Sequence, residues 1–231
     1  MPDDVAVRTS NYRGTALAQM HDLWGAWIES VGDVQDCMFP IMLDAGDDFQ
    51  AATYNALTGF YRFSMSGLRS ALELVTIGTW AQVCGKDQEF MAWREGKGPI
   101  SFGRACDGLM TATDALRQHL RNTVQDSLFD QKSATSEGGF VRQIYSGVSE
   151  FSHSRPGYAD ADVRESNGPI YVRSAFNHLA WVHFETFGLC FVLVLLARPK
   201  MRLPKPALDL LNDPARLKSR VTRAAFEYLR H

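Results

Sequence analysis

The feature that most constrains the fold is a narrow polar stripe on a segment that otherwise has the pattern of a buried helix. From Tyr54 to Val83 there is no proline, and apolar side chains recur at helical spacing. The polar side chains fall on one line along the helix, at steps of seven, four, three and four residues: Asn55, Arg62, Ser66, Arg69 and Glu73. An uncompensated buried charge costs several kcal/mol. The pattern therefore predicts a long central helix whose charges are paired or in contact with a ligand.

The composition is that of a globular protein with a substantial core. The chain has 231 residues, of which 45% are hydrophobic and 22% charged, and we expect a single domain over residues 1–231. A net charge of -2 provides no general attraction to nucleic acid. The four cysteines are far apart and show no zinc-like spacing, so neither a metal site nor a cofactor is predicted. The N-terminus lacks the pattern of a secretory signal, which favours a cytoplasmic location.

A strongly apolar segment, Leu179 to Ala197, is the second constraint on the fold. His183 and Glu185 interrupt it, and the uninterrupted stretch from Thr186 is shorter than the roughly 20 residues that a membrane span requires. We therefore predict a buried core helix and no membrane association. The Glu185 carboxylate needs a cation or a proton there, and Arg62 or Arg69 is its predicted partner. The alternative is that Glu185 faces water at a gap in the bundle.

Helical periodicity extends over most of the remaining chain, and strand signals are nearly absent. Residues 1–14 have the composition of a polar lead-in, and residues 126–139 that of a mobile loop. The other predicted helices are Ala16–Val31, Asp87–Glu95, Phe102–Thr123, Phe140–Ser152, Arg173–Arg198 and Pro214–Tyr228. Residues 199–231 form a basic, helical C-terminal extension. The predicted fold class is all-α, a single helical bundle with a long central helix and a buried apolar helix in its C-terminal half.

The predicted helix Phe140–Ser152 has an apolar face and a polar face that continues past its end. Tyr145, Ser149 and His153 gather on the polar face, and Arg155 follows closely. A histidine beside hydroxyl groups is suited to acid–base chemistry or to holding a phosphate, and an arginine adds a bidentate donor. A solvated face with a helix-ending histidine is the alternative interpretation.

Arg173 and His178 lie at the start of the apolar helix, separated by four residues. Here the chain resembles the HEPN superfamily, all-α bundles in which an Arg-x4-6-His motif near a helix start often serves a metal-independent ribonuclease. The resemblance implies that Arg173 and His178 are a catalytic pair, completed across a homodimer that acts on one RNA strand. Histidine would move a proton at the 2′-hydroxyl or leaving oxygen, and arginine would stabilise the charged phosphate.

These observations lead to one hypothesis and two alternatives. The leading hypothesis is a HEPN-like protein that binds or cleaves RNA or binds a nucleotide, and the resemblance suggests prokaryotic defence or a toxin–antitoxin system. Arg69, Glu73 and Glu185 would organise its interior. The first alternative is a non-catalytic module that binds a protein partner through its basic terminal helix and its polar loop. The second is a small-ligand pocket lined by Tyr61, Trp80 and Trp181.

Overall fold

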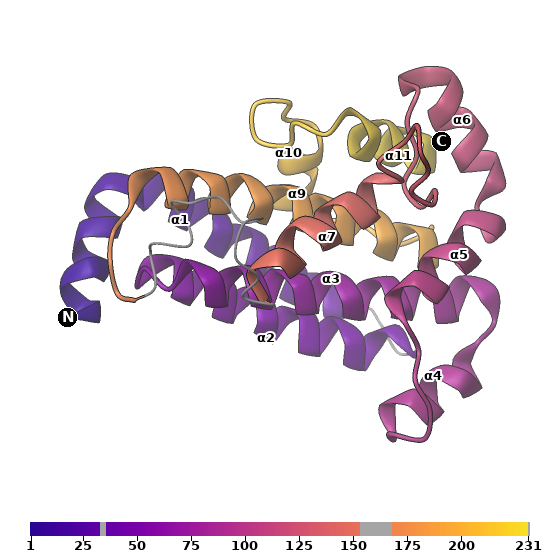
Figure 1. Cartoon of the computed structure of the whole chain (residues 1–231), viewed down its shortest axis with the longest axis horizontal. Coiled ribbons are helices and arrows are strands. Elements are labelled where there is room, and N and C mark those ends of the chain that lie inside the picture. Colours follow the sequence, from indigo (N-terminus) through magenta and orange to yellow (C-terminus); the bar gives the residue numbers. More distant parts are fainter. Residues whose placement is uncertain (33–35, 153–167, 231) are drawn as a thin grey trace.

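The structure is a computed structural model that describes residues 1–32, 36–152 and 168–230. This part of the chain forms ten α-helices and no β-strand, which confirms the predicted all-α class (Figure 1). The helices are α1 (Pro2–Val31), α2 (Met38–Leu57), α3 (Tyr61–Cys84), α4 (Asp87–Arg94), α5 (Phe102–Ala112), α6 (Asp114–Val124), α7 (Phe140–Ser152), α9 (Arg173–Ala197), α10 (Lys205–Leu211) and α11 (Arg220–Arg230).

Helix α9 lies in the core, as its apolar sequence predicts. It is long and apolar enough to cross a membrane, but 83% of its most apolar 18-residue stretch is buried inside the protein. Aromatic side chains dominate its packing, and Phe187 stacks on Phe49 of α2 with 3.8 Å between ring centres. Trp27 of α1 is also fully buried, and its ring centre lies 5.3 Å from that of Phe191. Rings of this size bury much apolar surface, so α9 joins α1 and α2 into one core.

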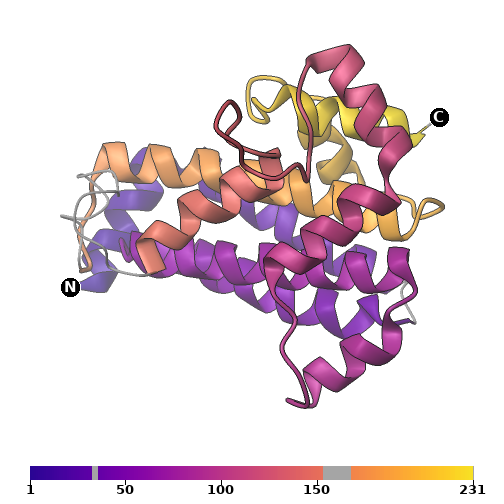
Figure 2. The ribbon, with the colours of Figure 1, turned by 45° about the vertical axis from the view of Figure 1, so that its right-hand side comes forward.

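Helix α3 is the central helix, and its neighbours lie on different faces. Ser64 donates to the carbonyl of Ala52 in α2, and Thr79 donates to the carbonyl of Leu193 in α9. Arg69, five positions after Ser64, contacts α7. At about 100° per residue, Ser64 and Arg69 lie about 140° apart and thus on nearly opposite faces of α3. Helices α2 and α7 therefore pack on opposite sides of α3, as Figures 1 and 2 also show.

The prediction of one helix from Tyr54 to Val83 was wrong, because the chain breaks between α2 and α3. Gly59 has a φ of +82°, and a Cβ atom there would lie 2.4 Å from the carbonyl oxygen of Ile170. The break thus combines a left-handed backbone with a close approach of a distant segment, and both require glycine. As a result Asn55 belongs to α2, where its side chain bonds to the Ala51 carbonyl, and only four members of the stripe remain on α3.

Two other predicted boundaries were wrong for local reasons. Residues 1–14 are not a lead-in, because α1 begins at Pro2, where a proline in the first turn followed by acidic residues favours a helix start. A kink at Arg13 separates this part from the remainder of α1, and the Arg13 side chain bonds to Tyr171. The predicted helix Phe102–Thr123 is divided at Thr113, whose φ of -113° and ψ of 35° are not helical.

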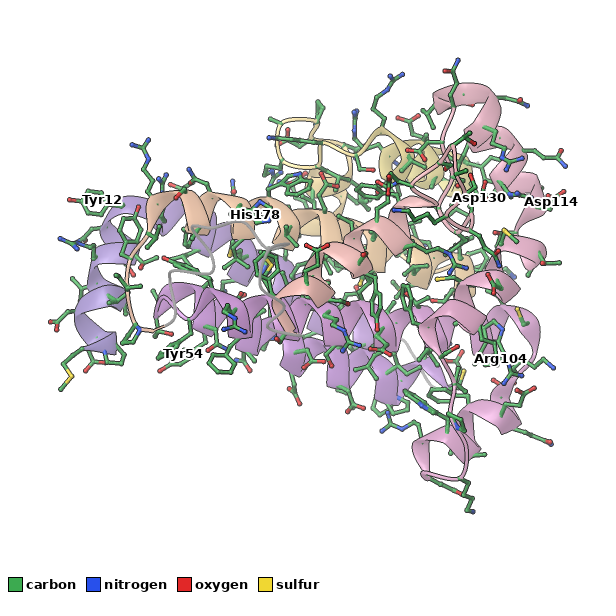
Figure 3. All side chains as sticks on the ribbon, in the orientation of Figure 1. Tyr12, Tyr54, Arg104, Asp114, Asp130 and His178 are labelled. Atoms are coloured by element: carbon green, nitrogen blue, oxygen red, sulfur yellow. The ribbon has the colours of Figure 1, made fainter. Side chains whose placement is uncertain are left out.

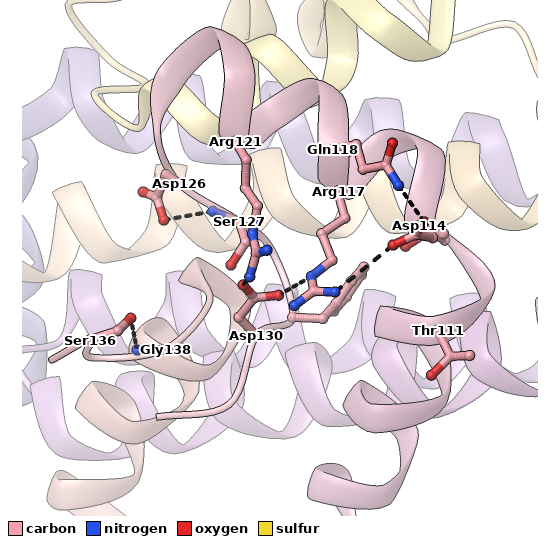
Figure 4. A network of polar contacts seen from close by, with 12 residues as sticks. Thr111, Asp114, Arg117, Gln118, Arg121, Asp126, Ser127, Asp130, Ser136 and Gly138 are labelled. Atoms are coloured by element: carbon pink, nitrogen blue, oxygen red, sulfur yellow. Dashed lines mark hydrogen bonds and ion pairs between the residues drawn. The ribbon is translucent and has the colours of Figure 1, made fainter. Parts of the chain in front are cut away.

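The loop before α7 is anchored at its base by a charged cluster (Figure 4). Asp130 accepts hydrogen bonds from Arg117 and Arg121 of α6, each at 2.6 Å. Partial burial alone would raise the pKa of Asp130, but the hydrogen bonds and positive charges of the two guanidinium groups outweigh it and lower the pKa. Backbone hydrogen bonds from Phe140 and Val141 to the loop then fix where α7 begins.

Candidate functional site

The polar stripe of α3 faces α7, and Arg69 lies at its centre. Arg69 donates from Nε to Ser149 Oγ at 3.1 Å and from Nη2 to the Tyr145 hydroxyl at 2.6 Å. The same Nη2 lies 3.1 Å from Glu73 Oε2, and the guanidinium carbon lies 5.0 Å from the centre of the Tyr145 ring. Arg69 and Glu73 retain 28% and 27% exposure. Arg69 Nη1 donates to none of the described residues.

Tyr145 connects the two charges of the stripe. Its hydroxyl accepts from Arg69 and donates to Glu73 Oε2 at 3.1 Å. Burial and the nearby Glu73 carboxylate raise the pKa of Tyr145, which keeps the phenol protonated and able to donate. The ring stacks on Phe102 of α5 with 3.7 Å between ring centres and an interplanar angle of 11°. The sequence analysis missed Phe102, because nothing in the spacing links it to a residue 43 positions later.

The C-terminal end of α7 lies between α3 and α9. Arg62 of α3 donates to the Phe151 carbonyl at 3.3 Å, and the Phe151 ring lies 6.3 Å from the ring of His178 on α9. His178 is half-buried on the α9 surface (Figure 3), and its ring centre lies 5.7 Å from that of Trp181. Arg62, Arg69 and His178 therefore surround the end of this helix. The predicted site residues His153 and Arg155, which follow it, lie outside the described residues.

Arg173 and His178 do not face each other in one chain. Both lie in the regular helix α9, which begins at Arg173, and Arg173 is exposed. Five residues along an α-helix correspond to a rotation of about 140°, so the two side chains leave the helix in different directions. Only His178 lies beside α7. A joint role for the pair therefore requires a second subunit to bring its own arginine to the site.

The predicted pairing of Glu185 with Arg69 or Arg62 was wrong. Glu185 is fully buried, and its Oε1 accepts from Trp181 Nε1 at 3.1 Å and from the backbone N–H groups of Lys218 and Ser219 at 2.8 and 3.1 Å. Its Oε2 has no hydrogen-bond partner among the described residues. Burial raises the pKa of Glu185 and outweighs these hydrogen bonds, which by themselves would lower it. Glu185 therefore anchors the turn that leads into α11 and is not part of the α3–α7 cluster.

The basic helix α11 uses its apolar face for the core and leaves only part of its charge on the surface. Four of its apolar side chains are buried: Val221, Ala224, Ala225 and Phe226. Arg220 and Arg230 are exposed, and Tyr228 lies against His119 of α6 with 4.8 Å between ring centres. The predicted role of this helix in binding a partner therefore concerns its outer row of cations.

The fold and these contacts define an all-α helical protein with an arginine-centred polar interface between its central helix and α7. Comparison of the chain with protein-family models, with curated proteins and with solved structures finds no match in any of the three. The assignment of a function therefore depends on the chemistry of the cluster itself.

Proposed function

We propose that this chain binds the phosphate backbone of RNA where the end of α7 meets α3 and α9. The observation that carries the proposal is the state of Arg69, whose guanidinium is held by Tyr145, Ser149 and Glu73 and yet keeps 28% exposure and an Nη1 that donates to none of the described residues. A guanidinium fixed in this way binds a phosphate oxygen without losing further side-chain freedom. The nearby carboxylate of Glu73 lowers the local positive charge, so a phosphate ligand needs contacts beyond Arg69 to bind here.

Two neighbouring groups support a polyanionic ligand rather than a single phosphate. Arg62 lies two helical turns before Arg69 on the same stripe, and His178 of α9 lies beside Phe151 at the end of α7. Together they extend the basic region over a length greater than one phosphate group. His153 and Arg155, which the sequence places directly after α7, would add further donors. The likeness to HEPN proteins, taken from the sequence, points to the same ligand class.

Cleavage is the catalytic form of the same proposal. A neutral His178 would take the proton of an RNA 2′-hydroxyl, the 2′-oxygen would attack the adjacent phosphorus, and the bond to the 5′-oxygen would break as that oxygen takes a proton from the imidazolium or from water. The products would be a 2′,3′-cyclic phosphate and a 5′-hydroxyl end. Arg173 of a second subunit would stabilise the charged transition state, so this form of the proposal includes a homodimer.

The test of binding is fluorescence anisotropy with a labelled single-stranded RNA at low salt. Arg69→Gln removes the guanidinium and keeps a polar side chain. We expect a Kd about tenfold or more higher than that of the wild type, the range expected for one charge-assisted phosphate contact. Arg94→Gln is the matched control, because Arg94 is 30% exposed and pairs with Asp44 of α2. Equal affinities of the two variants, or no binding by the wild type, would contradict the proposal.

The test of cleavage uses the same RNA on a denaturing gel. We expect the wild type to produce cyclic-phosphate ends and His178→Ala to lose that activity while it still binds RNA. Wild-type cleavage that equals that of His178→Ala would limit the proposal to binding.

A further inference from the structure

The α1–α2 side of the protein has an unusual charge composition. From Gly14 to Tyr61 the sequence has seven acidic residues and neither a lysine nor an arginine. This stretch covers most of α1 and all of α2, and α2 lies on the opposite side of α3 from α7. This surface therefore differs in position and in charge from the proposed RNA site, and a ligand bound to it is independent of RNA binding.

A groove with apolar walls runs between α1 and α2. It has a volume of about 380 Å³ and lies between Leu17 and Trp24 of α1 and Tyr54 and Leu57 of α2. Tyr54 is 65% exposed. Large side chains that project into solvent rather than into the core suggest a surface that another molecule covers.

The apolar surface continues beyond the groove along both helices. Phe39 and Leu43 of α2 are each 41% exposed and lie on the same helical row as Tyr54. Ile28 of α1 is 37% exposed and reaches α2, since its Cδ1 is the nearest atom to a Cβ placed on Gly46. From Phe39 to Tyr54 the row spans fifteen residues, or about 22 Å of helix. A partner helix of about four turns would match this length.

Exposed carboxylates lie beside the apolar surface on both helices: Asp47 follows the row of Tyr54 on α2, and Asp22 and Glu29 share a face of α1 with Ala18, which lines the groove. Asp22 and Glu29 of α1 and Asp47 of α2 are exposed, and none of them forms an ion pair with a described residue. Asp44, in contrast, forms an ion pair with Arg94 of α4. On α1, Ala18 and Gly25 lie on the same face as Asp22 and Glu29, and a Cβ atom on Gly25 would meet no atom within 4 Å. The small side chains leave room for a helix backbone, and the carboxylates would face its cations.

We propose that this groove, lined by Leu17, Trp24, Tyr54 and Leu57 and flanked by Asp22, Glu29 and Asp47, docks a cationic amphipathic helix of a partner protein. Apolar side chains at i, i+4, i+7 and i+11 of the partner would enter the groove. Lysine or arginine residues beside that apolar stripe would meet the three carboxylates. The complementary charges select this partner over a neutral or acidic helix and increase the association rate.

The test uses two fluorescein-labelled model helices of 18 residues with leucine on one face. The other face carries lysine in the first helix and glutamate in the second. By fluorescence anisotropy we expect the leucine–lysine helix to bind at least about tenfold more tightly than the leucine–glutamate helix, with an affinity that falls as salt rises. Equal binding of the two helices would overturn the proposal.

Two double variants separate docking in the groove from general attraction to an acidic protein. Glu29→Lys/Asp47→Lys reverses charges beside the groove, and we expect affinity for the leucine–lysine helix to fall about tenfold. Asp114→Lys/Glu137→Lys makes the same change in net charge elsewhere, and Asp114 lies at the opposite end of the long axis from Tyr54 (Figure 3). We expect it to bind within about twofold of the wild type. Equal losses in the two variants would overturn the proposal.

Tyr54→Ala tests the contribution of the apolar wall, and the oligomeric state of the free protein tests whether a second copy covers the groove. Tyr54→Ala changes a side chain that is 65% exposed, so the fold should be retained, which circular dichroism checks. We expect it to weaken binding of the leucine–lysine helix severalfold. A wild-type dimer in light scattering that Tyr54→Ala converts to a monomer would show that a second copy of this chain covers the groove. That result would overturn the partner-helix proposal.

Discussion

His183 predicts a specific dependence of stability on pH. Its imidazole is fully buried, and neither ring nitrogen has a hydrogen-bond partner among the described residues. The ring instead lies among phenylalanines, with ring centres 5.0 Å from Phe187, 6.3 Å from Phe49 and 6.4 Å from Phe184. Burial in this apolar environment lowers the pKa of His183 from 6.5 to about 3. The folded protein therefore holds a neutral imidazole at any pH near neutrality.

The sign of the effect follows from proton binding in the two states. In the unfolded chain His183 has its ordinary pKa of about 6.5, so below that pH the unfolded state binds a proton that the folded state does not. The free energy of unfolding is then highest above pH 6.5 and falls as the pH decreases towards 3. Between pH 7 and pH 5 the expected loss from this one group is about 2 kcal/mol.

Urea unfolding of the wild type and of His183→Phe at pH 7 and pH 5 measures this contribution. Phenylalanine suits the aromatic environment and does not titrate, so the variant should lose about 2 kcal/mol less than the wild type on acidification. His183→Leu provides a second comparison in case phenylalanine packs poorly. If the free energies of all three proteins changed equally between the two pH values, the assignment of a buried, neutral His183 would be refuted.

Two other predictions concern the break before α3 and the anchor of α11. Gly59→Ala places a Cβ atom against the Ile170 backbone in a left-handed conformation, and we expect urea unfolding to show a loss of about 2 kcal/mol or more. Burial raises the pKa of Glu185, so its contribution to stability falls as the pH rises above the unfolded value of about 4.5. The free energy of unfolding of Glu185→Gln minus that of the wild type should therefore be larger at pH 7 than at pH 4. The opposite trend would show that Glu185 is stabilised as an anion.

The α3–α7 cluster shows where sequence reasoning succeeds and where it stops. The stripe of Arg62, Arg69 and Glu73 and the polar face of Tyr145 and Ser149 were each predicted from helical spacing, which depends only on neighbours along the chain. Their contact with each other was not predicted, because several helices had polar faces of similar character. Glu185 was instead assigned to Arg62 or Arg69, and that assignment failed because backbone N–H groups of the turn before α11 donate to this carboxylate.

The groove between α1 and α2 illustrates the same division. The absence of lysine and arginine between Gly14 and Tyr61 is visible in the sequence. It produces an acidic surface with an apolar groove only because the two helices pack side by side. No helix was predicted over Phe39 and Leu43, which belong to α2. The sequence also does not show that the core is already filled by the opposite face of α2, which leaves these side chains in solvent.

The sequence by itself determined that the chain is helical, that α9 lies in the core and that polar residues line one side of α3. These properties follow from the amphipathic repeat of each segment, a local quantity. The tertiary structure decided which faces meet, where Gly59 breaks the chain and which side chains remain exposed. These depend on contacts between distant segments, such as Gly59 with Ile170, and several apolar helix faces compete for the same interior.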